Sequence, residues 1–218
     1  NMGRMNDTLR YFSRPHFYGR WHGDDIRFSA VYAFHENFIL PLSHDEVVYG
    51  KGSLLARQPG DEWQRFAGLR NLYGLMWTHP GKKLLFMGGE FGQAEEWHHE
   101  RTLDWHLWAR PAHAGLACWV TDPNAAYRRL PALHRHDFDS QGFAWLPCER
   151  LEPTILAFLR RGGPEDAPVV AIVNLTPEPR TALRVAMPEP GGWHEVLNSD
   201  AAFYGGSGGG NLGRGRRW

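Results

Sequence analysis

The sequence predicts an α/β segment built on a parallel sheet, followed by an all-β segment. Two short apolar runs, Asn37–Ser43 and Lys83–Met87, flank an amphipathic stretch from Glu62 to Thr78, which gives the order strand, helix, strand. After about His136 the chain changes to short β-rich segments separated by turns that contain glycine and proline. That texture is typical of an all-β sandwich.

The residues before the first strand carry weaker patterns. Apolar residues recur at helical spacing from Met2 to Phe12, and Pro15 stops the predicted helix. Ser13–Asp25 is irregular and is expected to be a loop. The pattern of Ile26–Phe34 does not distinguish a short helix from a strand.

The first predicted strand, Asn37–Ser43, ends abruptly in the polar residues His44, Asp45 and Glu46. A continuous apolar run suits a strand that is buried on both faces, and parallel-sheet enzymes place their chemistry where such strands end. The residues alone leave three roles open: a polar cap, a metal site, or a substrate-facing acid with a histidine beside it. Successive strand residues point to opposite sides, so Asp45 and Glu46 face one ligand only if the chain turns between them.

The predicted helix from Glu62 to Thr78 has Asp61 as its N-cap. Its expected buried stripe comprises Trp63, Phe66, Leu69, Tyr73, Met76 and Trp77. The second strand ends in Gly88-Gly89-Glu90, so parallel pairing brings Glu90 to the same rim as Asp45.

A long loop from Gln93 to Arg110 is predicted on this rim, where ligand contacts usually lie. The adjacent pair His98-His99 could bind a metal, but two solvated histidines are the stronger interpretation. Helical character returns over Ala114–Leu133, with an expected interruption at Pro123. The β-rich segments are expected at Gly142–Leu146, Thr154–Arg160, Val169–Leu175, Thr181–Met187 and Trp193–Asn198, before a glycine-rich tail at 205–215 that is expected to be loop or disordered.

Composition narrows the class of protein. Lys+Arg and Asp+Glu number 24 each, so the net charge is near zero and nothing indicates a nucleic-acid partner. The two cysteines fit a reducing compartment. With no apolar run of about 18 residues and no signal-peptide pattern, we expect a cytoplasmic protein without membrane contact. No residue pattern calls for a metal or another cofactor.

Several long motifs carry a family resemblance. They are LPLSHDEVVYGKGSLL, PGDEWQRFAGLRNLYGLMWTHPGKKLLFMGGEFGQ, EEWHHERTLDW and the opening NMGRMNDTLRYF. In this order they resemble the C-terminal part of bacterial 1,4-α-glucan (glycogen) branching enzymes, which belong to the α-amylase superfamily.

The resemblance implies a (β/α)₈ TIM barrel followed by an antiparallel β-sandwich. Residues 1–135 would be the C-terminal portion of the catalytic barrel, with Asn37–Ser43 as strand seven and Lys83–Met87 as strand eight. Residues 136–218 would be an incomplete sandwich. The chain would therefore be a fragment of a longer protein.

The resemblance also implies a reaction. Branching enzymes cleave an α-1,4-glucan such as glycogen or amylose and transfer the piece to a 6-hydroxyl, with retention through a glycosyl-enzyme. Asp45 matches the acid that stabilises the transition state, and His44 matches the histidine that bonds the same sugar. Glu90, Glu46 and Trp97 are expected to contact substrate.

The chain departs from the family pattern in one respect that matters for activity. The family's nucleophile and general acid would lie upstream of Asn1, so the isolated chain is expected to be inactive. A smaller departure is Tyr49, which stands where a histidine is expected. The alternatives are a non-catalytic glucan-binding module and another glucan enzyme of the α-amylase superfamily.

Overall fold

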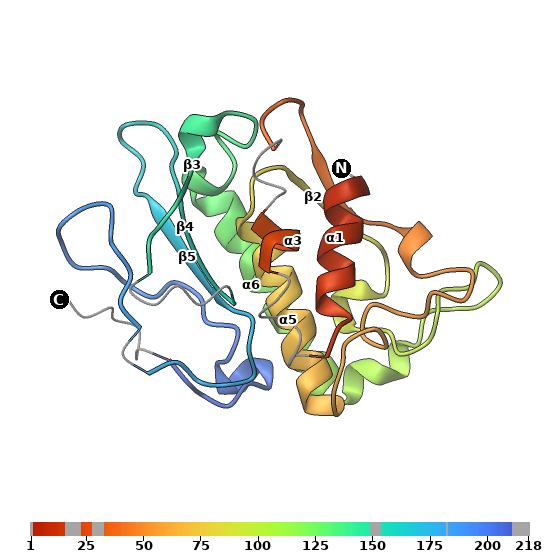
Figure 1. The fold of residues 1–218 in the computed structure, drawn as a ribbon. Coiled ribbons are helices and arrows are strands. Elements are labelled where there is room, and N and C mark those ends of the chain that lie inside the picture. The colour runs from red at the N-terminus through yellow and green to blue at the C-terminus, as the bar shows by residue number, and fades with distance from the viewer. Residues whose placement is uncertain (1, 16–22, 28–32, 149–153, 182, 211–218) are drawn as a thin grey trace.

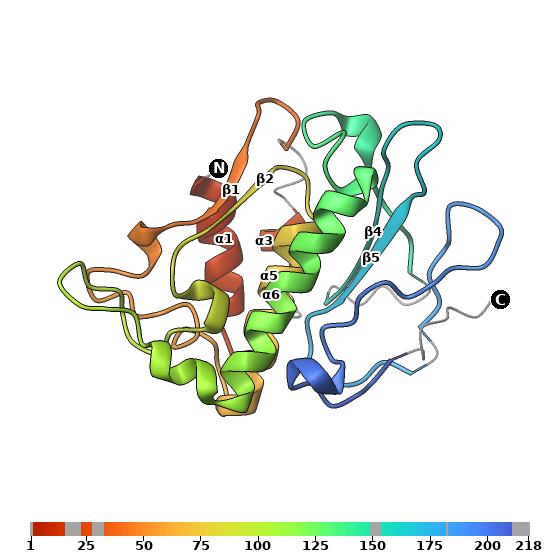
Figure 2. The same ribbon diagram turned by 180° about the vertical axis from the view of Figure 1, so that it is seen from behind.

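A computed structural model describes residues 2–15, 23–27, 33–148, 154–181 and 183–210. Two long helices, α5 and α6, run through the middle of the molecule. A three-stranded sheet lies on one side of them, and α1 with the two strands β1 and β2 lies on the other, as Figures 1 and 2 show from opposite directions. The helices are α1 (Met2–Phe12), α3 (Gly23–Arg27), α5 (Glu62–Thr78) and α6 (Pro111–Arg129), and the strands are β1 (Ile39–Leu42), β2 (Lys82–Leu85), β3 (Phe143–Trp145), β4 (Ile155–Arg160) and β5 (Val169–Asn174).

The N-terminal helix is confirmed by α1. The loop expected at Ser13–Asp25 is wrong where α3 begins at Gly23, and residues 16–22 lie outside the described part. Of the undecided stretch Ile26–Phe34, the first two residues are helical, and residues 28–32 are not described.

The predicted strand–helix–strand unit is confirmed. β1 and β2 pair in parallel, with Ile39 opposite Lys82 and Leu42 opposite Leu85. α5 begins where expected, with a reciprocal capping box: the Asp61 carboxylate accepts from the Gln64 amide at 2.8 Å, and the Gln64 side chain accepts from the Asp61 amide at 2.9 Å.

The single buried stripe predicted for α5 is too simple. Trp63 is half exposed, whereas Leu72 and Leu75, which lie outside the predicted stripe, are buried. The reason is that α5 is covered on several sides, by α6, by β1 and by the C-terminal sheet (Figure 1). A helix covered in this way has no polar face of the usual width.

The interruption expected at Pro123 is wrong, because α6 continues through it. The proline lacks the amide that would donate to the Trp119 carbonyl, and two neighbouring side chains add hydrogen bonds to other carbonyls of the helix. Asn124 Nδ2 donates to the Val120 carbonyl at 3.0 Å, and the Thr121 hydroxyl donates to the Ala117 carbonyl at 2.9 Å. The Trp119 indole also donates to the Arg70 carbonyl at 2.9 Å, which holds α6 against α5.

The C-terminal segment forms one antiparallel sheet in the order β3-β4-β5, rather than a sandwich, in the residues that the structure describes. Three of the five expected β segments are confirmed. Trp193–Asn198 forms no strand, and the described residues of 181–187 contribute only an isolated bridge between Val185 and Cys148. The face that carries Leu156 and Phe158 shares a core with the helices, and the central strand β4 is buried on its other face as well.

One hydrophobic core joins the two predicted domains. Leu156 and Phe158 of β4 belong to the same buried cluster as Leu69 and Tyr73 of α5 and Leu116 of α6. The division near residue 135 stays a prediction, and the shared core means that the sheet and α5 stabilise one another. No helix in the described ranges is long and apolar enough to cross a bilayer.

Candidate functional site

The polar residues after β1 form a short 3₁₀ turn, His44–Glu46, which gives them different surroundings. The His44 and Asp45 side chains are 56% and 54% exposed, and His44 Nε2 lies 3.2 Å from Asp45 Oδ1. The Glu46 side chain is only 7% exposed. Asp45 is therefore open to solvent and Glu46 is buried. The two residues lie on a 3₁₀ turn and not on the strand for which opposite directions were expected.

Glu46 is held by two cations that the sequence did not single out. Its carboxylate lies 3.1 Å from Arg57 Nη1 and 3.2 Å from Lys51 Nζ. Arg57 also donates to the Glu46 carbonyl, and Lys51 donates to the Asp45 carbonyl at 2.7 Å. Buried carboxylates need such partners, so these contacts make Glu46 part of the support of the turn. No periodicity or motif in the sequence signals this pairing.

The end of β2 is a tight turn shaped by two glycines. Gly88 and Gly92 flank the 3₁₀ turn Gly89–Phe91 with φ of 87° and 70°, which side chains seldom adopt. The Tyr73 hydroxyl of α5 donates to the Gly89 carbonyl at 2.7 Å. Burial, with a smaller contribution from the charge of Glu90, raises the pKa of Tyr73 and keeps it neutral. Glu90 itself is partly exposed.

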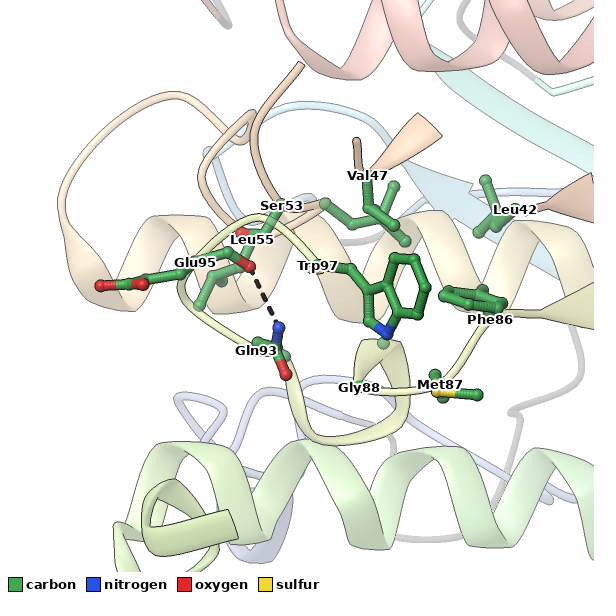
Figure 3. A pocket seen from close by; sticks show the side chains of 13 residues that line it. Leu42, Val47, Ser53, Leu55, Phe86, Met87, Gly88, Gln93, Glu95 and Trp97 are labelled. Atoms are coloured by element: carbon green, nitrogen blue, oxygen red, sulfur yellow. Dashed lines mark hydrogen bonds between the residues drawn. The ribbon is translucent and has the colours of Figure 1, made fainter. Parts of the chain in front are cut away.

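Trp97 lies in the wall of a small cavity between the two strand ends (Figure 3). Its ring packs edge-on against Phe86, with centroids 5.2 Å apart, and Phe86 lies 5.8 Å from the His44 ring. The Trp97 amide donates to the Val47 carbonyl at 2.9 Å, which fixes the loop after β2 to the loop after β1. Two predicted site residues, His44 and Trp97, thus lie against Phe86 at one end of the strands, and Asp45 lies beside His44.

The structure gives less support to the other residues considered for the site. Among the described residues, no hydrogen bond or ion pair joins Glu90 to Asp45. His98 and His99 stack on each other at 4.9 Å and are exposed, which agrees with solvated residues. No group of three metal-ligating side chains occurs within the described part of the chain.

The β-rich segment matches a known class of domain. A family model described as "Alpha amylase, C-terminal all-beta domain" matches residues 145–216. The antiparallel sheet formed by β4 and β5 lies within this range.

The whole chain resembles bacterial enzymes whose printed name is 1,4-alpha-glucan branching enzyme. The chain is 55% identical over 98% of its length to the protein of Cereibacter sphaeroides, 56% over 98% to that of Aromatoleum aromaticum, and 54% over 98% to that of Aquifex aeolicus. It covers 29%, 33% and 34% of these relatives, or about a third of their length. The chain is therefore a homologue of glycogen branching enzymes, as its motifs predicted, and a C-terminal fragment fits the β-domain match.

Proposed function

We propose that the chain is the C-terminal portion of a 1,4-α-glucan branching enzyme and that the ends of β1 and β2 form part of its glucan site. The similarity along nearly the whole chain carries this proposal. The parallel pair β1–β2 around α5 is consistent with the last two strands of a (β/α)₈ barrel. A cytoplasmic location and an α-glucan substrate, such as glycogen or amylose, belong to the same proposal.

Within this site, Asp45 would stabilise the transition state, and His44 would bond the same sugar. The exposed Asp45 carboxylate makes only one contact with a side chain in the described residues, the contact to His44, so it is available to a ligand. An anionic oxygen beside an oxocarbenium-like transition state strengthens its interaction as positive charge develops. Trp97 and Glu90 would line the site, whereas the buried and paired Glu46 would position the turn.

Asp45→Asn in the complete protein tests the proposal. The change keeps the shape and removes the charge, so we expect kcat to fall by about a hundredfold or more. The melting temperature should stay within a few degrees, because the side chain is exposed and has little packing to lose. Branching is followed by iodine staining and by counting α-1,6 linkages in amylose.

Asp139→Asn is the matched control, because Asp139 is also a partly exposed aspartate and lies just before β3 in the C-terminal segment. It should leave kcat unchanged. The isolated chain, assayed in parallel, is expected to show no branching, since the family's nucleophile is not matched by any motif in it. An Asp45→Asn enzyme that keeps more than about a tenth of the wild-type kcat contradicts the assigned role. Glucan binding without any turnover by the complete wild-type protein would favour the binding-module alternative.

A further inference from the structure

Tyr49 has an unusual position in the loop after the candidate catalytic turn. Its side chain is 94% exposed, the highest value among the large hydrophobic side chains that the structure describes. Its backbone is left-handed, with φ of 60°, and it is the one residue other than glycine with positive φ in the described ranges. A bulky residue pays a steric cost in this conformation, which glycine avoids.

On one side, the loop that carries Tyr49 is held by contacts that involve Glu46. The Arg57 guanidinium bonds to both the carboxylate and the carbonyl of Glu46, and its Nε donates to the Lys51 carbonyl at 2.9 Å. Lys51 in turn donates to the Asp45 carbonyl. The segment that carries Tyr49 is therefore tied to the backbone of the residue proposed to act on the sugar.

The other side is held by the loop after β2. The Glu96 carboxylate accepts from the amide of Gly50 at 2.7 Å and from the amide of Gly52 at 3.4 Å. The Ser53 hydroxyl donates to the Ala94 carbonyl at 2.9 Å. Surrounding contacts of this kind are what allow a strained backbone conformation to persist.

The ring of Tyr49 contributes nothing to this scaffold. Within the described residues it has no aromatic partner and no side-chain hydrogen bond, so internal contacts do not offset the strain or the exposed apolar surface. A turn that needed only the left-handed conformation would be satisfied by glycine, as the next residue, Gly50, demonstrates with φ of 78°. The ring of Tyr49 is therefore open at the surface of the described residues.

We propose that Tyr49 is a substrate-binding residue whose ring stacks on a glucose unit of the α-glucan at the edge of the Asp45 site. This inference rests on the proposed function for the chemical class of its ligand. One face of a pyranose ring is lined by C–H groups, and aromatic side chains bind such surfaces while their polar edges stay solvated. A loop fixed before binding loses little further conformational entropy when the sugar arrives.

The test compares Tyr49→Ala and Tyr49→Phe in the complete protein, with amylose as substrate. We expect Tyr49→Ala to raise KM about tenfold, corresponding to about 1.4 kcal/mol of lost binding, and to change kcat by less than about twofold. Tyr49→Phe keeps the ring and should keep KM within about twofold of wild type. Phe203→Ala, which removes another exposed ring on the C-terminal segment, should leave KM unchanged.

The outcomes separate the two proposals. A wild-type protein that branches amylose, with the same KM in Tyr49→Ala, overturns the role of Tyr49 and leaves the proposed function standing. A Tyr49→Ala protein whose melting temperature drops by several degrees with KM unchanged also overturns it, because the ring would then be packed against another part of the complete protein. A wild-type protein without activity on any α-glucan overturns both.

Discussion

Replacement of Asp137 by asparagine should destabilise the protein strongly, because this carboxylate is the anion of a buried polar cluster. Its side chain is fully buried, as is that of Arg160, which donates to it at 2.9 Å. Lys82 Nζ and the Tyr127 hydroxyl donate to its other oxygen at 3.0 and 2.8 Å. Burial alone would raise the pKa of Asp137, but Lys83, Arg160 and Lys82 together lower it below its ordinary value.

The expected loss of stability in Asp137→Asn depends on the positive charge that stays buried beside the neutral amide. Removing one partner of a buried ion pair costs about 3–5 kcal/mol, because the other charge stays buried without compensation. We expect about 3 kcal/mol, the lower end, since Arg160 keeps its bonds to the carbonyls of Thr78 at 2.7 Å and Gly142 at 3.2 Å. The new side-chain amide would also turn an N–H donor toward either Lys82 or Arg160.

Urea denaturation, followed by the near-ultraviolet signal of the tryptophans, measures the difference in the free energy of unfolding. The control is Asp7→Asn, which breaks an ion pair with the exposed Arg10 and should cost less than about 1 kcal/mol.

The lowered pKa means that Asp137 stabilises the folded state above its unfolded pKa, about 3.9, and that this contribution disappears as the pH falls through the lower folded value. The gap between wild type and Asp137→Asn should therefore be constant above about pH 5 and narrow below it. A cost near that of Asp7→Asn at neutral pH would refute this reasoning.

Two further predictions concern α5. Asp61→Ala should lower the free energy of unfolding by about 0.5–2 kcal/mol through loss of the N-cap, and Asp61→Ser should recover most of it; equal stabilities in urea would show that the capping box contributes nothing. His79 ends the helix and is buried; burial, then the charge of Arg4, lowers its pKa well below the ordinary value. As the pH falls below about 6.5, His79 takes up a proton in the unfolded chain but not in the folded one, so the free energy of unfolding should decrease. His79→Gln should therefore show a shallower decrease in urea midpoint between about pH 7 and 5 than the wild type.

Elements with strong local signals could be predicted from the sequence. α5 is the clearest case, because Asp61 and Gln64 make a capping box within four residues and the helix ends before Pro80. β1 and β2 could be predicted because apolar runs end in turn residues at both places. These signals are local, so they survive without knowledge of the fold.

The predictions of secondary structure that were wrong concern segments held by contacts between residues distant in sequence. Trp193–Asn198 carries strand-forming residues, yet neighbouring Ser199 and Gly205 offer their carbonyls to Arg70 of α5, at 2.8 and 3.4 Å. Tyr204 packs on Trp119 with centroids 5.0 Å apart, which places the following turn, Ala202–Tyr204, along α6. Tertiary contacts here override β propensity, which is a weak preference.

At the candidate site too, only the features with a local signal could be predicted from the sequence. The position of His44 and Asp45 after a strand is a local signal, and their side chains are exposed there. Their roles stay predictions. The support provided by Arg57 and Glu96 could not be predicted, because each reaches the loop from another segment and charged residues at the surface carry no periodic pattern.

The two ends of β2 contact different parts of the molecule. At its first residue, Lys82 bonds to Asp137 and joins β2 to the C-terminal segment. Beyond its last residue lies Phe86, which packs against His44. Three steps of about 3.3 Å between the four residues of β2 place roughly 10 Å between these ends, and sites at that separation without shared partners usually act independently. The Asp137 cluster therefore contributes to holding β2 against the C-terminal segment, whereas the exposed Asp45 carboxylate takes no part in that packing. Asp137→Asn should accordingly act mainly on stability, and the effect proposed for Asp45→Asn should be separable from it.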